Sequence, residues 1–439
     1  MINRSKQWWL TIETYVHISL KTRTLLLYNS LSGEALEYPG GGKVSALVKK
    51  LKSPKNLQVI LLTDEELKDP VIGQFVDELR RHFMGDLIDT SYSGGKPIQM
   101  IPITKIHRDV NYLKSKVDLS VGEGLMDNLN QISLYINNEC EQNCSLCSQG
   151  FRQFPCCTIK KNGKRELDIA KIERVFDEIS SQPPASLNIL GGNIFDYSEF
   201  IKLTRLIHRF PQVIYYCNYL NVNRGKANIK FLSHCSSSVK ILVPFPIHED
   251  QLKTALEIVK NSKLNSSFVF IVQSEEEYEK SNAVISDLSI DNPDFQPFFN
   301  GKNLDFFMEG VFVSKEEILE GKPEMNDIYT NSVLNSQNFG RLTILSNGHA
   351  HANVNASRLG ILGKDSIYDV LYKEMYHGKS WRRVRKNVQP CKRCTFQALC
   401  PPLSNYTYAL GRNNLCHVMP DENKSEKKII KNGGKYHEN

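Results

Sequence analysis

A regular alternation of strand-like and helix-like segments between residues 131 and 299 constrains the fold more than any other feature of the chain. Short apolar segments alternate there with longer segments that carry apolar residues at helical spacing. The expected strands are 132–136, 186–190, 213–217, 239–243, 268–272 and 294–299. The expected helices are 168–181, 198–210, 227–235, 249–263 and 275–288. This order predicts an α/β fold with a parallel sheet and right-handed crossovers, and six units suit a partial (β/α)6 barrel better than a complete eight-fold one.

Three cysteines follow the first expected strand at the spacing Cys-x3-Cys-x2-Cys: Cys140, Cys144 and Cys147. In parallel barrels the chemistry lies at the C-terminal ends of the strands, and Cys140 comes just beyond the first strand. Thiolates are the ligands of iron–sulfur clusters, most of which take four cysteines. Three close cysteines would leave one iron open to a ligand that is not protein. The alternative, three unrelated thiols in a loop, requires order, spacing and strand context to coincide by chance.

A second cysteine group lies near the C-terminal end of the chain and consists of Cys391, Cys394, Cys400 and Cys416. Four cysteines complete the ligand set of one tetrahedral metal ion or of one four-iron cluster. The spacing alone leaves zinc and iron–sulfur open. The chain has 11 cysteines, and seven of them fall into these two groups, which favours metal ligands over disulfides in a reducing compartment.

Composition and charge narrow the class of protein. A chain of 439 residues with 41% hydrophobic and 23% charged residues is typical of an ordinary globular protein of two or three domains. No apolar run reaches the ~18–20 residues that span a bilayer, and the N-terminus lacks the pattern of a signal peptide. We therefore expect a cytoplasmic protein without a membrane span. The net charge of +7 comes without an RRM, helix-turn-helix or zinc-finger signature, so nucleic acid is not an expected partner.

The first cysteine motif resembles that of the radical S-adenosylmethionine (radical SAM) superfamily. The resemblance implies that its three cysteines hold a [4Fe-4S] cluster whose open iron binds SAM. It also implies that Gly191, Gly192 and Asn193, after the second strand, bind the amino group of SAM. The family has a glutamate where this chain has Asn193, and a neutral amide has no charge with which to pair an ammonium. We therefore expect weaker SAM binding than in a typical relative, and tighter binding in Asn193→Glu.

The second cysteine group resembles the SPASM extension of radical SAM peptide maturases, which normally carries two auxiliary [4Fe-4S] clusters. The four cysteines match the spacing of the second of these clusters. The first would need a cysteine at Ser404 and another near the Gly348 hairpin, where residues 349–353 contain none. The resemblance therefore implies one auxiliary cluster. His349 and His351 alternate like neighbours on one strand face, and they are either metal ligands or solvated histidines.

The rest of the chain divides around the barrel. Residues 1–95 form an α+β module that resembles the winged-helix precursor-recognition element of peptide-modifying enzymes, which adds a leader peptide to its sheet edge. Residues 96–130 are expected to be a linker, 131–305 the barrel, 306–420 the SPASM-like domain, and 421–439 a disordered tail. Cys156 and Cys157 are interpreted as loop residues, and Cys217 and Cys235 as buried thiols.

Three short runs narrow the resemblance to the peptide maturases of Bacteroidales GG-type ribosomal natural-product systems. They are residues 400–406, 414–417 and 28–33. That group contains active maturases and a pseudo-radical-SAM branch. One hypothesis is an enzyme that acts on a ribosomal precursor peptide through hydrogen abstraction by a 5′-deoxyadenosyl radical. The second is a silent partner that binds the precursor peptide or a paralogous maturase. A third is a zinc-stapled binding protein without iron.

Overall fold

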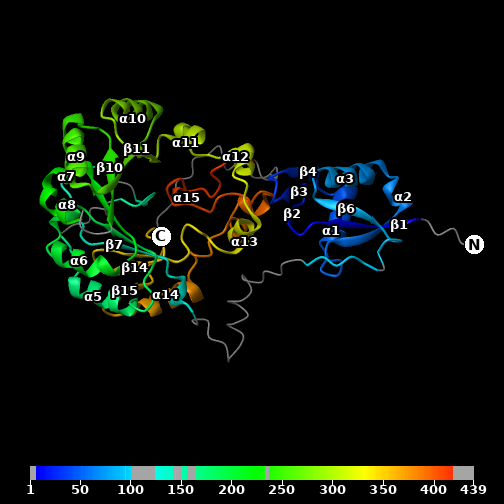
Figure 1. Ribbon diagram of the computed structural model, residues 1–439, viewed down its shortest axis with the longest axis horizontal. Helices are drawn as coiled ribbons and strands as arrows, with labels where there is room; N and C mark the ends of the chain where they lie inside the picture. The colour runs from blue at the N-terminus through cyan, green and yellow to red at the C-terminus, as the bar shows by residue number, and fades with distance from the viewer. Residues whose placement is uncertain are drawn as a thin grey trace, which may run out of the picture.

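The computed structural model describes residues 6–93, 95–100, 124–142, 144, 146, 150–156, 164–232 and 237–418. Cys147, Cys157, Cys235, most of the expected linker and the expected tail lie outside these residues. In Figure 1 the N-terminal module (blue) lies at one end of the molecule and the barrel (green) at the other. Helices α12 (Lys315–Glu320), α13 (Met325–Val333) and α15 (Tyr406–Ala409) lie between them (Figure 1).

The predicted parallel sheet is confirmed. Its strands are β7 (Gln131–Tyr135), β8 (Ser186–Leu190), β9 (Val213–Asn218), β10 (Ser237–Pro244), β11 (Asn265–Val272) and β12 (Pro293–Pro297). They pair in parallel and in sequence order. Three later strands extend the same sheet beyond β7, namely β13 (Arg341–Ile344), β14 (His349–His351) and β15 (Gly360–Ile361). Because β13 runs parallel to β7, a segment from the C-terminal part of the chain extends the parallel sheet past its first strand.

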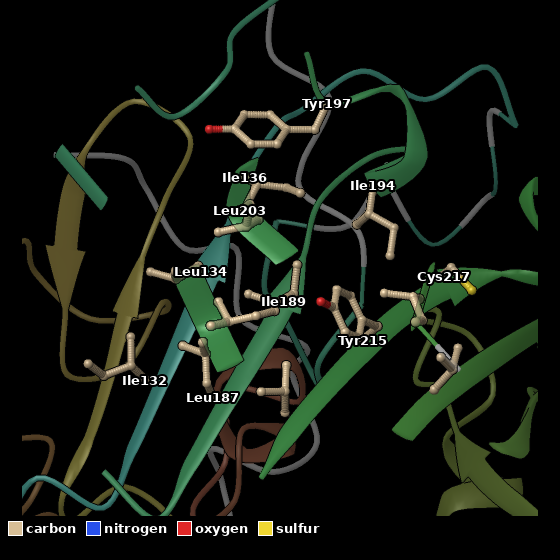
Figure 2. Close-up of a cluster of buried hydrophobic side chains, with 14 of the residues drawn as sticks. Ile132, Leu134, Ile136, Leu187, Ile189, Ile194, Tyr197, Leu203, Tyr215 and Cys217 are labelled. Atoms are coloured by element: carbon tan, nitrogen blue, oxygen red, sulfur yellow. The ribbon is translucent and has the colours of Figure 1, made fainter. Parts of the chain in front are cut away.

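Crossover helices cover the outer face of this sheet. They are α5 (Ile169–Glu178), α6 (Phe200–Leu206), α7 (Tyr219–Arg224), α8 (Lys226–Leu232), α9 (Glu249–Ser262) and α10 (Glu275–Asp287). Alternate strand residues point toward them and form the largest hydrophobic core, part of which Figure 2 shows. Leu134 of β7, Ile189 of β8 and Tyr215 of β9 belong to it.

The helix expected at residues 227–235 corresponds to α8, which is shorter than expected, and a second helix, α7, comes before it. The side chain of Asn218 accepts a hydrogen bond from Leu220 N–H at 2.9 Å and thereby caps α7 directly after β9. Gly225 separates α7 from α8, and a Cβ there would lie 2.3 Å from the Phe195 ring. The close contact with Phe195 therefore requires glycine at this break.

The inner face of the sheet is divided into an apolar and a polar half. Leu242 of β10 and Ile271 of β11 pack against Leu146, which lies within the first cysteine motif, and against Phe154, which follows it. Most inner positions of β7, β8 and β13 are polar instead, although Tyr135 and Leu190 face the same cavity. The polar ones are Gln131, Ser133, Asn188, Arg341 and Thr343. Most buried barrel interiors are filled by branched apolar side chains, so the polar half marks a region open to a ligand.

The N-terminal module contains two three-stranded sheets with orders β5-β1-β6 and β2-β3-β4. Its elements are β1 (Gln7–Ile12), β2 (Val16–Leu20), β3 (Thr24–Asn29), β4 (Ala35–Pro39), α1 (Lys43–Leu51), β5 (Val59–Thr63), α2 (Asp64–Leu67), α3 (Pro70–Arg81) and β6 (Gly85–Asp89). Helix α3 begins at Pro70, because the Asp69 side chain caps it and proline suits the first helical position. A separate core of apolar side chains stabilises the module.

The module packs on the C-terminal part of the chain. Leu26 and Tyr28 of β3 share a hydrophobic cluster with Phe396 and with Cys394 and Cys400 of the second cysteine group. The C-terminal elements are α11 (Leu304–Gly310), α12 (Lys315–Glu320), α13 (Met325–Val333), α14 (Ile367–His377) and α15 (Tyr406–Ala409). No helix in the described ranges is both long and apolar enough to cross a membrane.

Candidate cysteine sites and the barrel cavity

Cys140 and Cys144 lie in the loop that follows β7, and both are partly exposed. Asn218, at the end of β9, lies with its Nδ2 3.7 Å from Cys144 Sγ. The guanidinium of Arg224 pairs with Glu141 and lies close enough to Cys140 for their charges to interact. Its pKa is raised, chiefly by the hydrogen bond to Glu141. The loop thus brings two of the three expected ligands to the C-terminal edge of the sheet, while the third falls outside the described residues.

The glycine pair after β8 is in direct backbone contact with this loop. Gly192 N–H donates to Asn137 Oδ1 at 2.8 Å, and Asn193 N–H donates to the Glu139 carbonyl at 2.6 Å. A Cβ on Gly192 would lie 1.8 Å from that carbonyl oxygen, and one on Gly191 would lie 2.4 Å from Asn137 Oδ1. Only glycine permits this approach. Gly191 and Gly192 therefore fix the position of the loop that carries Cys140.

The Asn193 side chain is buried, and both ends of its amide contact its own turn. Its Oδ1 accepts a hydrogen bond from Phe195 N–H at 3.3 Å and caps the short 3-10 helix Ile194–Asp196. Its Nδ2 donates to the Asp196 carboxylate at 2.8 Å. Asp196 is exposed and lies within electrostatic range of Arg224, as Cys140 does. Sequence reasoning missed Asp196, although an asparagine followed three residues later by an aspartate is a pattern of capped turns.

The second cysteine group is gathered in the C-terminal part of the chain. Cys391, Cys394 and Cys400 are buried and Cys416 is partly buried. Burial raises the pKa of Cys400 to about 12 and that of Cys394 to about 11. In both cases the neighbouring cysteines add to the increase through their negative charge. The four thiols therefore lie close enough together to interact electrostatically.

A buried arginine accompanies these four thiols. Arg385 donates from Nε to the Pro401 carbonyl at 2.7 Å, and its NH1 lies 3.5 Å from Cys391 Sγ. In the described part of the chain its hydrogen-bond partners are carbonyl oxygens and this thiol, and none is a carboxylate. A buried cation requires a counter-charge, which deprotonated cysteines would supply. The donor set thus fits a thiolate-bound metal centre.

The side-chain positions do not themselves form a mononuclear metal site. Among the described residues, no three His, Cys, Asp or Glu side chains converge as the ligands of one metal ion do. The choice between zinc and an iron–sulfur cluster for Cys391, Cys394, Cys400 and Cys416 therefore rests on their chemistry.

The two histidines of β14 contact neighbouring polar groups. His349 Nε2 lies 3.1 Å from an Arg358 nitrogen, and His351 Nδ1 lies 3.0 Å from the Ala356 carbonyl oxygen. Their ring centroids are 6.5 Å apart. Both rings line a pocket of about 200 Å³ together with Arg152 and Arg165. Cationic neighbours repel a metal ion, so this arrangement favours hydrogen-bonded histidines over metal ligands.

A second cavity, of about 270 Å³, lies inside the barrel. Inner-face residues of β7, β8 and β13 line it, and so does Gln296 of β12. Tyr406 of α15 also lines this cavity and donates a hydrogen bond to the Pro297 carbonyl of β12 at 2.6 Å. Asn353 and Ser404 also line this cavity, and Asn353 Nδ2 donates to Asn405 Oδ1 at 2.7 Å. The positions that would supply cysteines to a first auxiliary cluster are thus part of a polar cavity wall.

Comparison with known proteins gives distant similarities. No protein-family model matches the chain, and no curated protein matches it. The structure is similar to anSMEcpe with bound AdoMet at a TM-score of 0.45 and 14% identity, over 64% of this chain and 91% of that one. It is similar to Streptococcus suis SuiB bound to the precursor peptide SuiA at a TM-score of 0.38 and 13% identity, over 89% and 94% of the two chains. It is similar to SuiB bound to S-adenosylmethionine at a TM-score of 0.40 and 13% identity, over 93% of this chain and 100% of that one. These values are too low for the similarities to assign a function.

Proposed function

We propose that this chain is a radical SAM iron–sulfur protein that acts on a ribosomally synthesised precursor peptide. The observation that carries the proposal is the position of the Cys140 loop at the C-terminal edge of a parallel barrel sheet, where such folds place their chemistry. Cys140, Cys144 and Cys147 would hold the cluster. When reduced by one electron, a [4Fe-4S] cluster with bound SAM would release methionine and supply the 5′-deoxyadenosyl radical for hydrogen abstraction from the peptide.

The chain's own residues would bind and orient the cofactor and the peptide, and they would exclude water. Gly191 and Gly192 hold the cysteine loop against β8 through backbone contacts. The apolar half of the barrel interior, which includes Leu242 and Ile271, lies against Cys144 and excludes water on that side. Asp196 supplies the carboxylate that position 193 lacks, and Asn193 orients it through their hydrogen bond.

The two flanking regions have separate parts in the proposal. Cys391, Cys394, Cys400 and Cys416 would hold one auxiliary centre, with Arg385 balancing the thiolate charge. The N-terminal module would recognise the precursor at the edge strand β4 by strand addition. We place the protein among GG-type maturases on the three sequence runs described above.

A second candidate function is a catalytically silent pseudo-radical-SAM partner that binds the precursor peptide or a paralogous maturase. The observation that favours it is the Asn193 amide, which is buried and engaged with Phe195 and Asp196. A side chain in that state offers nothing to the SAM ammonium unless the turn rearranges.

Anaerobic purification with iron and sulfide analysis, followed by a SAM cleavage assay with a strong reductant, separates these functions. The enzyme is expected to bind about eight irons in two clusters and to release 5′-deoxyadenosine from SAM. About eight irons without SAM cleavage would identify the silent partner. Zinc without iron would contradict both.

A further inference from the structure

The barrel cavity has room for a side chain of a bound peptide. Its volume is about 270 Å³, whereas an engineered protein cavity of about 150 Å³ holds benzene. The cavity lies on the polar half of the interior and extends along the inner face of β7 from Gln131 to Tyr135. Its ligand should therefore carry polar groups.

The charge of the cavity wall is positive. Arg341 and the buried Arg152 line it, and none of the described lining residues is Asp or Glu. Among the described residues, no carboxylate forms an ion pair with the Arg341 side chain. The main-chain groups of Arg341 hold β13 in place. Arg341 is exposed to solvent, and desolvation of part of its side chain lowers the pKa of the guanidinium. A cavity with cationic groups and low-dielectric walls attracts an anion.

A buried hydrogen-bond acceptor lies in the same wall. Asn188 of β8 is 2% exposed. Its Nδ2 donates to Ser133 Oγ at 3.2 Å, while its Oδ1 has no hydrogen-bond partner within the described structure. An unsatisfied buried acceptor destabilises the folded state. The atom is closed to solvent in this structure, so a ligand N–H would satisfy it once side chains of the cavity wall move apart, and the main chain of a peptide carries such groups.

We propose that this cavity binds an acidic residue of the substrate peptide. The Arg341 guanidinium pairs with the side-chain carboxylate, and Asn188 Oδ1 accepts a hydrogen bond from a peptide N–H. The inference rests on the proposed function and specifies the substrate class. Asn353 and Ser404 occur where a first auxiliary cluster would have its cysteines, and they line this same cavity, which leaves the space to the peptide.

The position of Arg341 favours a peptide carboxylate over the carboxylate of SAM. Arg341 is opposite Gln131, at the start of β7, whereas the cysteine loop follows the end of that strand. At ~3.3 Å per residue, the strand between Gln131 and Tyr135 spans about 13 Å. An anion bound at Arg341 therefore lies at the opposite end of the strand from the Cys140 loop.

Peptide binding by the reconstituted full chain tests the proposal. The probes are two fluorescein-labelled pools of random seven-residue peptides that are identical except for glutamate or glutamine at the centre. Fluorescence anisotropy should show at least five-fold tighter binding of the glutamate pool. Arg341→Gln should abolish this preference, whereas Arg174→Gln, which removes an exposed arginine of α5, should keep it. Equal binding of both pools by the wild type, or binding of neither, overturns the proposal.

Further measurements identify the source of the carboxylate. Arg341→Glu should reverse the preference toward a matched pool with lysine at the centre, and an unchanged glutamate preference contradicts the proposal. If Arg341→Gln weakens SAM binding in calorimetry and keeps the peptide preference, Arg341 serves the cofactor and the proposal fails. The peptide measurement needs neither SAM nor a reductant. A protein that fails to cleave SAM can therefore still confirm or refute the acidic-residue site.

Discussion

Asn193 donates a hydrogen bond from Nδ2 to the carboxylate of Asp196 over 2.8 Å. The amide at position 193 therefore holds a carboxylate in place three residues further on. A glutamate at position 193 would lose the cap on Phe195 N–H and would bring a second negative charge toward Asp196. This contact changes the expectation that Asn193→Glu alone would tighten SAM binding.

We predict that Asp196→Asn weakens SAM binding about five-fold, which corresponds to ~1 kcal/mol for exchanging a charged for a neutral hydrogen bond. Calorimetry on the anaerobically reconstituted protein measures this. Asp291→Asn, which changes another exposed carboxylate, is the control. Asn193→Glu should tighten binding only in the Asp196→Asn background, because the two carboxylates then no longer compete. Tighter binding in the single variant would show that Asp196 is not part of the site.

Replacing Cys140, Cys144 and Cys147 together by alanine should remove about half of the bound iron, or about four of eight ions. Iron and acid-labile sulfide analysis after anaerobic reconstitution checks this. The matched control is Cys156→Ala, which removes a buried thiol near the same loop. Iron content equal to that of the wild type in the triple variant would rule out the assignment.

Cys394→Ala should destabilise the protein more than Cys217→Ala. Both thiols are buried, but Cys217 lies in the apolar barrel core, whereas Cys394 would ligate a centre whose binding energy contributes to folding. The cavity left by one thiol in the core costs on the order of 1 kcal/mol, and loss of a metal ligand costs several times that. Thermal unfolding of the reconstituted variants gives the comparison. The same melting temperature for both would argue against a metal centre.

The stability of the N-terminal module should fall below about pH 6.5 because of His17 on β2. Burial lowers the pKa of His17 from 6.5 to about 4, and the charges of Lys52 and Lys21 contribute. The folded state thus binds fewer protons than the unfolded state, so the contribution is complete above pH 6.5 and is lost as the pH falls toward 4. At pH 5 the loss is about 2 kcal/mol. Chemical denaturation of the wild type and of His17→Gln over this pH range should show a steeper decline in the wild type.

Tyr406→Phe should lower the free energy of unfolding by about 1–2 kcal/mol, because the Pro297 carbonyl and the Gln296 side chain, both on β12, lose a hydrogen-bond partner. Tyr278→Phe on α10, a partly exposed tyrosine, should change it by less than about 0.5 kcal/mol. Urea denaturation midpoints of both variants test this prediction, and equal midpoints would contradict a stabilising contact between Tyr406 and β12.

The barrel strands could be predicted because burial on both faces gives each one a short apolar run between turn signals. The expected 186–190 strand agrees with β8 at both ends. The pairing of β13 with β7 could not be predicted, because a four-residue strand carries no mark of the edge that it joins. The positions of Cys140 and Gly192 follow from strand order, and the structure places both at the same edge. Arg341 and Asn188 were missed because their shared cavity depends on register between distant strands.

The place of β13 beside β7 has a consequence for synthesis of the protein on the ribosome. At ~5–20 residues per second, β7 emerges roughly 10–40 s before β13 is available to cover its edge. During that interval the nascent barrel presents an unpaired parallel edge, which is a template for pairing with other chains. The inward-facing Gln131 and Ser133 make that edge less apolar. A chaperone that shields the growing chain until residue 344 has been added would therefore raise the yield of native protein.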